Sequence, residues 1–101
     1  MKLKQLDIFP ARLEAFCRRW HVQELALFGS VLREDFRPDS DVDILITLRP
    51  GDRLSLDNRS AMMDELAEIF GRKVDLVEKR HIRNPFRRQA ILTSKKVVYA
   101  A

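Results

Sequence analysis

Residues 42–48 predict a β-strand with two unlike faces, because side chains two apart in a strand point to the same side. One face is wholly apolar, and the other begins with two carboxylates. The members are Val42, Ile44, Ile46 and Leu48 on the first face, and Asp41, Asp43, Leu45 and Thr47 on the second. Neighbouring carboxylates disfavour each other's ionised form. The fold must therefore expose Asp41 and Asp43 at an edge or compensate them with a cation.

The segments around this strand predict helices and strands in alternation, from apolar side chains at helical spacing and from short apolar runs. In chain order we expect a helix after Pro10 with Leu13, Phe16, Cys17 and Trp20 on one face, a strand at 24–28, a short helix at 30–34, a turn at 35–40, a helix at 57–70, a strand at 73–78, a helix from Asn84 to about 92 and a strand at 97–99. This order predicts the α/β (α+β) class: a small mixed β-sheet flanked by helices, in one domain over residues 1–101.

The helix expected at 57–70 has clear end signals. Ser55 or Asp57 can cap its start, and Gly71 stands where a glycine typically ends a helix. Its inward residues should be Met62, Met63, Leu66, Ile69 and Phe70. Asn84 followed by Pro85 is a similar start signal for the next helix.

Composition excludes several classes of protein. A hydrophobic share of 46 % argues against disorder, and no apolar run is long enough to cross a bilayer. The single cysteine, Cys17, cannot form an internal disulfide, so we expect a cytoplasmic setting and no membrane partner. The net charge of +4 is uneven, since acidic residues gather at 34–43 and basic residues at 79–88.

Binding of a divalent cation would explain why Asp41 and Asp43 lie side by side. Mg²⁺ prefers oxygen ligands and is held by one or two carboxylates plus phosphates and waters. Asp75 lies in another predicted strand, between Val74 and Leu76, and could join them. Three carboxylates could hold two Mg²⁺ ions for an in-line displacement at a phosphate. The alternative is that Asp41 belongs to a turn and that Asp43 and Asp75 face solvent, as lone carboxylates usually do.

Gly29 and Ser30 follow the strand expected at 24–28. Glycine lets the backbone approach a phosphate closely. A helix starting there would add free N–H groups, and Ser30 would add a hydroxyl donor. A Gly-Ser pair alone is more often a simple turn.

The combined spacing resembles a known family. Gly29-Ser30, ten residues, then Asp41-Val42-Asp43 matches the GSx10DxD motif of the DNA polymerase β-like nucleotidyltransferase superfamily. The stretch 27–46, together with the segment around Asp75 and the segment 82–88, is similar to its minimal nucleotidyltransferase (MntA-like) branch. The resemblance implies the polymerase β-like fold. It also implies catalytic and metal-binding roles for Asp41, Asp43 and Asp75, nucleotide binding by Gly29 and Ser30, two Mg²⁺ ions, and ATP as substrate.

The resemblance also implies a partner. Many members act as antitoxins by transferring AMP from ATP to a tyrosine of a HEPN-type RNase toxin, with Asp75 helping to activate the acceptor hydroxyl. In a chain of this length we expect the acceptor to come from another protein, in a hetero-oligomer. A second hypothesis is an antitoxin that neutralises by complex formation with little or no catalysis.

The basic segment at 79–88 could contact ATP phosphates, nucleic acid or an acidic toxin surface. A solvated helix face is the simpler explanation of such a run. Only Phe86 interleaves with the charges, so we do not expect a base-stacking platform, and direct nucleic-acid binding ranks last.

Overall fold

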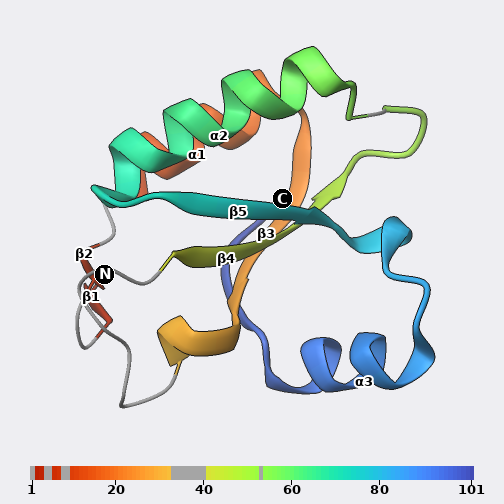
Figure 1. The fold of residues 1–101 in the computed structure, drawn as a ribbon. Helices are drawn as coiled ribbons and strands as arrows, with labels where there is room; N and C mark the ends of the chain where they lie inside the picture. Colours follow the sequence, from red (N-terminus) through yellow and green to blue (C-terminus); the bar gives the residue numbers. More distant parts are fainter. Residues whose placement is uncertain (1, 4–5, 8–9, 33–40, 53) are drawn as a thin grey trace.

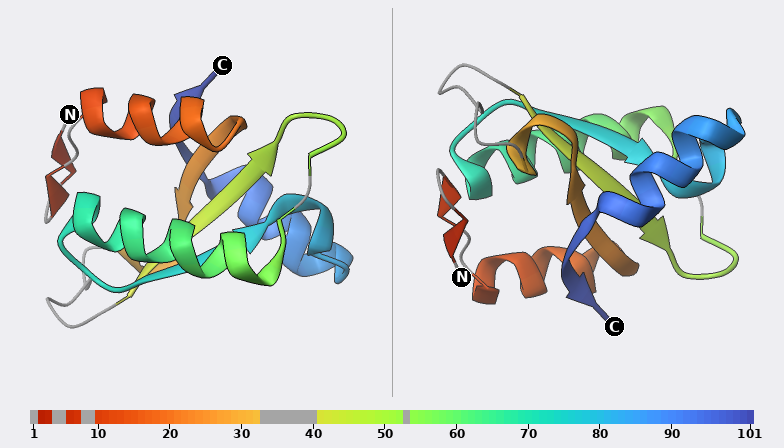
Figure 2. Two further views of the ribbon diagram at one scale, coloured as in Figure 1. Left: turned by 90° about the horizontal axis from the view of Figure 1, so that it is seen from above. Right: turned by 90° about the horizontal axis from the view of Figure 1, so that it is seen from below.

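Three layers make up the protein in the computed structural model (Figure 1). The structure describes residues 2–3, 6–7, 10–32, 41–52 and 54–101. Two helices lie side by side on one face of a four-stranded sheet, and a third helix lies on the opposite face (Figure 2). This confirms the predicted class, a small mixed sheet flanked by helices. In the described part of the chain, no helix is both long enough and apolar enough to cross a bilayer.

The elements follow the predicted order, with small shifts of their ends. Their bounds are β1 Lys2–Leu3, β2 Leu6–Asp7, α1 Pro10–Arg19, β3 Val22–Phe28, the 3₁₀ helix η1 Gly29–Leu32, β4 Val42–Leu48, α2 Leu56–Phe70, β5 Val74–Glu78, the 3₁₀ helix η2 Lys79–His81, α3 Pro85–Ser94 and β6 Lys96–Ala100. The hairpin β1–β2 was outside the prediction, because strands of two residues are too short to show a period. The turn expected at 35–40 lies outside the described residues.

The sheet has the strand order β5-β4-β3-β6. Strands β4 and β5 run parallel, whereas β3 runs antiparallel to both β4 and β6. The register places Asp43 opposite Phe28 on one side and opposite Asp75 on the other. Three segments that are distant in the sequence therefore meet at the beginning of β4.

The main core lies between the sheet and the helices α1 and α2. It contains the apolar face predicted for β4, and Phe16 and Leu66 from the two helices are fully buried in it. Trp20 packs against this core but is only partly buried, so the prediction that it lies inside needs correction. Its indole nitrogen donates to Glu65 Oε2 at 2.9 Å, a polar partner that keeps the ring at the edge.

A smaller core lies on the other face, beneath α3. Ala26, Phe28 and Leu45 from the sheet pack there against Ile82 and against Ile91 of α3. At Leu45, side chains from the helices therefore pack on both faces of the sheet. At the beginning of β4 this packing is less complete, and Asp43 is only partly buried.

The helix ends follow the predicted caps. Ser55 accepts a hydrogen bond from the Asn58 backbone N–H at 3.1 Å, so it, rather than Asp57, caps α2. Gly71 ends that helix with a left-handed φ of 68°. At α3 the side chain of Asn84 accepts from two backbone N–H groups of the first turn, which satisfies donors that a helix start leaves unpaired.

Cys17 is buried in the main core, and this burial raises the pKa of its thiol to about 12. Because only the thiolate reacts readily, we expect Cys17 to resist thiol reagents at pH 8 in the folded protein. Titration with a chromogenic disulfide should count one thiol in denaturant and almost none without it. Rapid labelling of the folded protein at a rate close to that of a free thiol would contradict this burial.

Candidate active site

The two halves of the predicted motif meet because of how β3 pairs with β4. Phe28, the last residue of β3, lies opposite Asp43, so Gly29 follows directly beside that carboxylate. Chain direction is reversed between the two strands, which brings the end of one to the beginning of the other.

Gly29 has the geometry that a close approach requires. Its φ of +76° lies in the left-handed region, which is costly for residues with a Cβ. A Cβ built on Gly29 would overlap Oδ2 of Asp43. By contrast, a Cβ on Gly71, whose φ of +68° is similar, would meet nothing within 4 Å. The glycine at position 29 is thus needed for the space beside the carboxylate as well as for the turn.

An open cavity of about 700 Å³ lies at this point, lined by Gly29, Ser30, Leu32, Asp43 and Ser94. That volume falls within the range of small-ligand sites. Sequence reasoning did not find Ser94, which comes from the end of α3 and whose hydroxyl donates to the Ala90 carbonyl at 2.7 Å. No motif marks this serine, and only the packing of α3 over the sheet brings it here.

The predicted helix after Gly29 is a 3₁₀ helix of four residues. This agrees with the short helix expected there, but its one turn contributes little helix dipole, because a single turn sums few peptide dipoles. What Gly29 and Ser30 offer a phosphate is backbone N–H groups and one hydroxyl.

Asp75 is brought close to Asp43 by the parallel register, but it is not buried. Its side chain is 52 % exposed on the edge strand β5, and the Arg59 guanidinium lies 3.6 Å from Oδ1. Arg59 also donates to the Leu76 carbonyl at 2.7 Å, so α2 holds it over this edge. Because β5 is an edge strand, the sheet leaves this carboxylate half exposed, and Arg59 compensates its charge.

Asp41 lies just before β4 and is exposed. Within the described residues, no three Asp, Glu, His or Cys side chains gather closely enough to form a ready metal cluster. The oxygen chemistry of Asp41 and Asp43 suits Mg²⁺, and Oδ2 of Asp43 occupies the space that a Cβ at position 29 would take. Asp75 could join them with the oxygen that does not face Arg59, or by leaving that contact. The roles assigned to the three carboxylates stay predictions.

The fold is that of the polymerase β-like nucleotidyltransferases. A family model described as the nucleotidyltransferase domain matches residues 12–98, most of the chain. The chain belongs to this family, and its relatives place it in the minimal nucleotidyltransferase branch.

Among these relatives, the protein adenylyltransferase MntA of Thermococcus cleftensis is 30 % identical over 98 % of this chain and 96 % of its own length. A solved toxin–antitoxin structure with AMP-PNP superposes with a TM-score of 0.73 at 24 % identity, over 93 % of this chain and 75 % of that one. A second structure, a tri-AMPylated HEPN toxin of Shewanella oneidensis in complex with its MNT antitoxin, has a TM-score of 0.64 at 23 % identity, over 91 % and 70 % of the two chains. At these identities the two structures show the shared fold.

Proposed function

We propose that this protein transfers AMP from ATP to a tyrosine hydroxyl of a HEPN-type RNase toxin and so acts as its antitoxin, in the cytoplasm where ATP is available. The observation that carries the proposal is the open cavity in which Gly29 leaves room against the Asp43 carboxylate. The names of the similar proteins support the reaction and the kind of partner.

In this proposal each residue has a role that follows from its position. Gly29 and Ser30 bind the triphosphate through N–H groups and a hydroxyl, and Asp41 and Asp43 would hold Mg²⁺. Such an ion would supply neutralisation of the phosphate charge during the displacement. The acceptor oxygen forms a bond to the α-phosphorus, the bond from that phosphorus to the bridging oxygen breaks, and pyrophosphate leaves. Asp75 takes the hydroxyl proton once it has left Arg59.

The test is transfer itself. Purified protein, ATP labelled at the α-phosphate, Mg²⁺ and the purified HEPN-type toxin should yield a labelled toxin whose modified peptide contains a tyrosine. Chelation of Mg²⁺ should stop the reaction, and adding Mg²⁺ back should restore it. An unlabelled toxin, or label on the toxin in the presence of chelator, would contradict the proposal.

Neutralisation by complex formation is the alternative, and a double variant separates the two. The combined Asp41→Asn and Asp43→Asn variant should lose both transfer and protection of cells from the toxin if catalysis dominates. Protection by a variant that transfers no AMP would favour neutralisation by binding. Pull-down of the toxin by the variant shows whether the complex itself still forms.

A further inference from the structure

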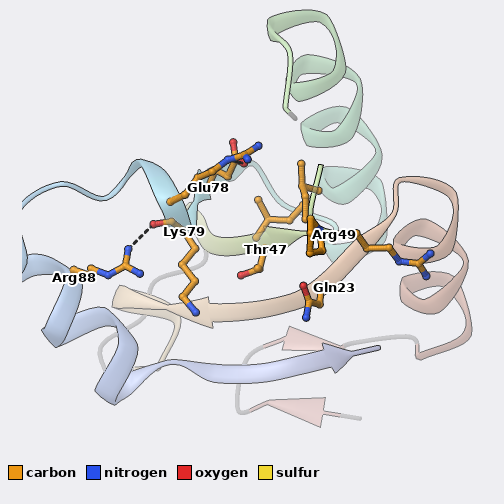
Figure 3. A pocket seen from close by; sticks show the side chains of 10 residues that line it. Gln23, Thr47, Arg49, Glu78, Lys79 and Arg88 are labelled. Carbon is orange, nitrogen blue, oxygen red and sulfur yellow. Dashed lines mark hydrogen bonds and ion pairs between the residues drawn. The ribbon is translucent and has the colours of Figure 1, made fainter. Parts of the chain in front are cut away.

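A second cavity, of about 290 Å³, opens on the sheet away from the nucleotide site. It lies where the end of β4 meets η2 and α3, and it shares no lining residue with the first cavity. We call it the basic cavity; the side chains that matter to it are Gln23, Thr47, Arg49, Glu78, Lys79 and Arg88 (Figure 3). Thr47 and Asp43 lie on the same face of β4, about 13 Å apart along the strand.

The charges around the basic cavity are unbalanced. Glu78 is buried, and its Oε1 pairs with the Arg80 guanidinium, which also donates to the Asp52 carbonyl at 2.7 Å. Arg80, whose side chain is half exposed, thus neutralises the buried Glu78. In the described part of the chain, no carboxylate forms an ion pair with Arg49, Lys79 or Arg88. The cavity is therefore a concave site with an excess of positive charge.

The basic segment of the sequence thus divides into two groups. Arg83, which precedes α3, and Arg87, on α3, are exposed to solvent. Lys79 and Arg88 are half-buried, and Arg88 is fixed by a 2.9 Å hydrogen bond from Nη1 to the Lys79 carbonyl. Figure 3 shows the Lys79 side chain extending from η2 toward the side of the sheet on which Thr47 lies. Cations that are already oriented lose less entropy when an anion binds.

The second oxygen of Glu78 narrows the choice of anion. Oε2 is buried and, in the part of the chain that the structure describes, accepts no hydrogen bond; the His81 ring nitrogen Nδ1 lies 3.5 Å away, and Arg80 pairs with the other oxygen, Oε1. A buried acceptor without a donor is costly, so a ligand that brings an N–H group gains there. A polyphosphate brings negative charge and no donor. A peptide brings both, because a carboxylate side chain comes with backbone N–H groups.

From these observations we infer that the basic cavity accepts an acidic side chain, Asp or Glu, from a segment of the acceptor protein. The inference rests on the proposed function, since it gives that acceptor a docking point on the same face as the nucleotide cavity. Phe86, two residues before Arg88, is 85 % exposed and offers an aromatic contact of the kind enriched at protein interfaces. Nucleic acid is less favoured, because a single aromatic side chain makes no stacking platform.

The test compares two double variants that remove the same charge. Lys79→Gln with Arg88→Gln changes the basic cavity, whereas Arg12→Gln with Arg18→Gln changes exposed residues of α1, on the opposite face. Three probes are titrated by calorimetry at low salt: the HEPN-type toxin, a blocked peptide with four glutamates, and a single-stranded RNA of equal charge. Lys79→Gln alone, which keeps the Arg88 hydrogen bond, serves if the first double variant unfolds.

We expect the cavity variant to weaken binding of toxin and peptide by about tenfold, as for the loss of two partly buried charge pairs. The α1 variant and the affinity for ATP should stay unchanged. Equal weakening by both double variants, or no saturable binding of the peptide to the unmodified protein, would overturn the inference. Tighter binding of the RNA, lost in the cavity variant, would overturn it in favour of a nucleic-acid site.

These outcomes separate the inference from the proposed function. If the toxin receives AMP and both double variants bind it equally well, the inference fails and the function stands. If the toxin neither binds nor receives AMP, the function fails. The inference then fails with it for the toxin as acceptor, and the peptide titration decides whether the cavity binds acidic side chains at all.

Discussion

Replacing Asp43 with asparagine is expected to lower the rate of AMP transfer by about 10²- to 10³-fold, the scale seen when one preorganised electrostatic group is removed from a site. Asp43 is the one predicted carboxylate that lines the 700 Å³ cavity proposed to bind the nucleotide, beside Gly29 and Ser30. Asparagine keeps the shape of the side chain but loses the charge that would hold Mg²⁺. The measurement is the initial rate of label transfer to the toxin under saturating ATP.

The matched control is Asp64→Asn, an exposed position on α2. It removes the same charge and should leave the rate unchanged. The free energy of unfolding of both variants should stay within about 1 kcal/mol of the unmodified protein, as is usual for substitutions outside the core. A rate for Asp43→Asn within threefold of the unmodified protein would show that this carboxylate is not part of the catalytic site.

Replacing Gly29 with alanine should lower the transfer rate by about 100-fold, because small displacements of reacting groups have effects of that order. The new Cβ would overlap Oδ2 of Asp43, and the flexible carboxylate must move away from the position it now holds. Alanine would also adopt a left-handed φ, which costs about 1–2 kcal/mol. Chemical denaturation and the transfer assay measure the two effects separately.

Gly71→Ala is the control that the chain itself provides. Its φ of +68° is close to that of Gly29, and nothing lies within 4 Å of the added carbon. Both variants should therefore lose a similar free energy of unfolding, about 1–2 kcal/mol, while only Gly29→Ala loses transfer. Equal activity of the two variants would mean that Gly29 serves the turn alone.

The sequence alone determined the class of fold, the order of its elements and the motif that marks the family. These features are local: the alternation in residues 42–48 selects a strand, and Ser55 and Gly71 set the ends of α2 through hydrogen bonds and φ angles within a few residues. Such features can be predicted from the sequence because they depend on residues that are close together along the chain.

The tertiary structure decided where those residues lie relative to one another. Pairing of β3 with β4 put Gly29 against Asp43, and the edge position of β5 exposed Asp75 to Arg59 rather than burying it. Packing of α3 brought Ser94 to the cavity beside Gly29 and Asp43, and Arg88 to the basic cavity. The physical reason is that strand order, register and helix docking follow from burial summed over the whole core, which no short segment encodes.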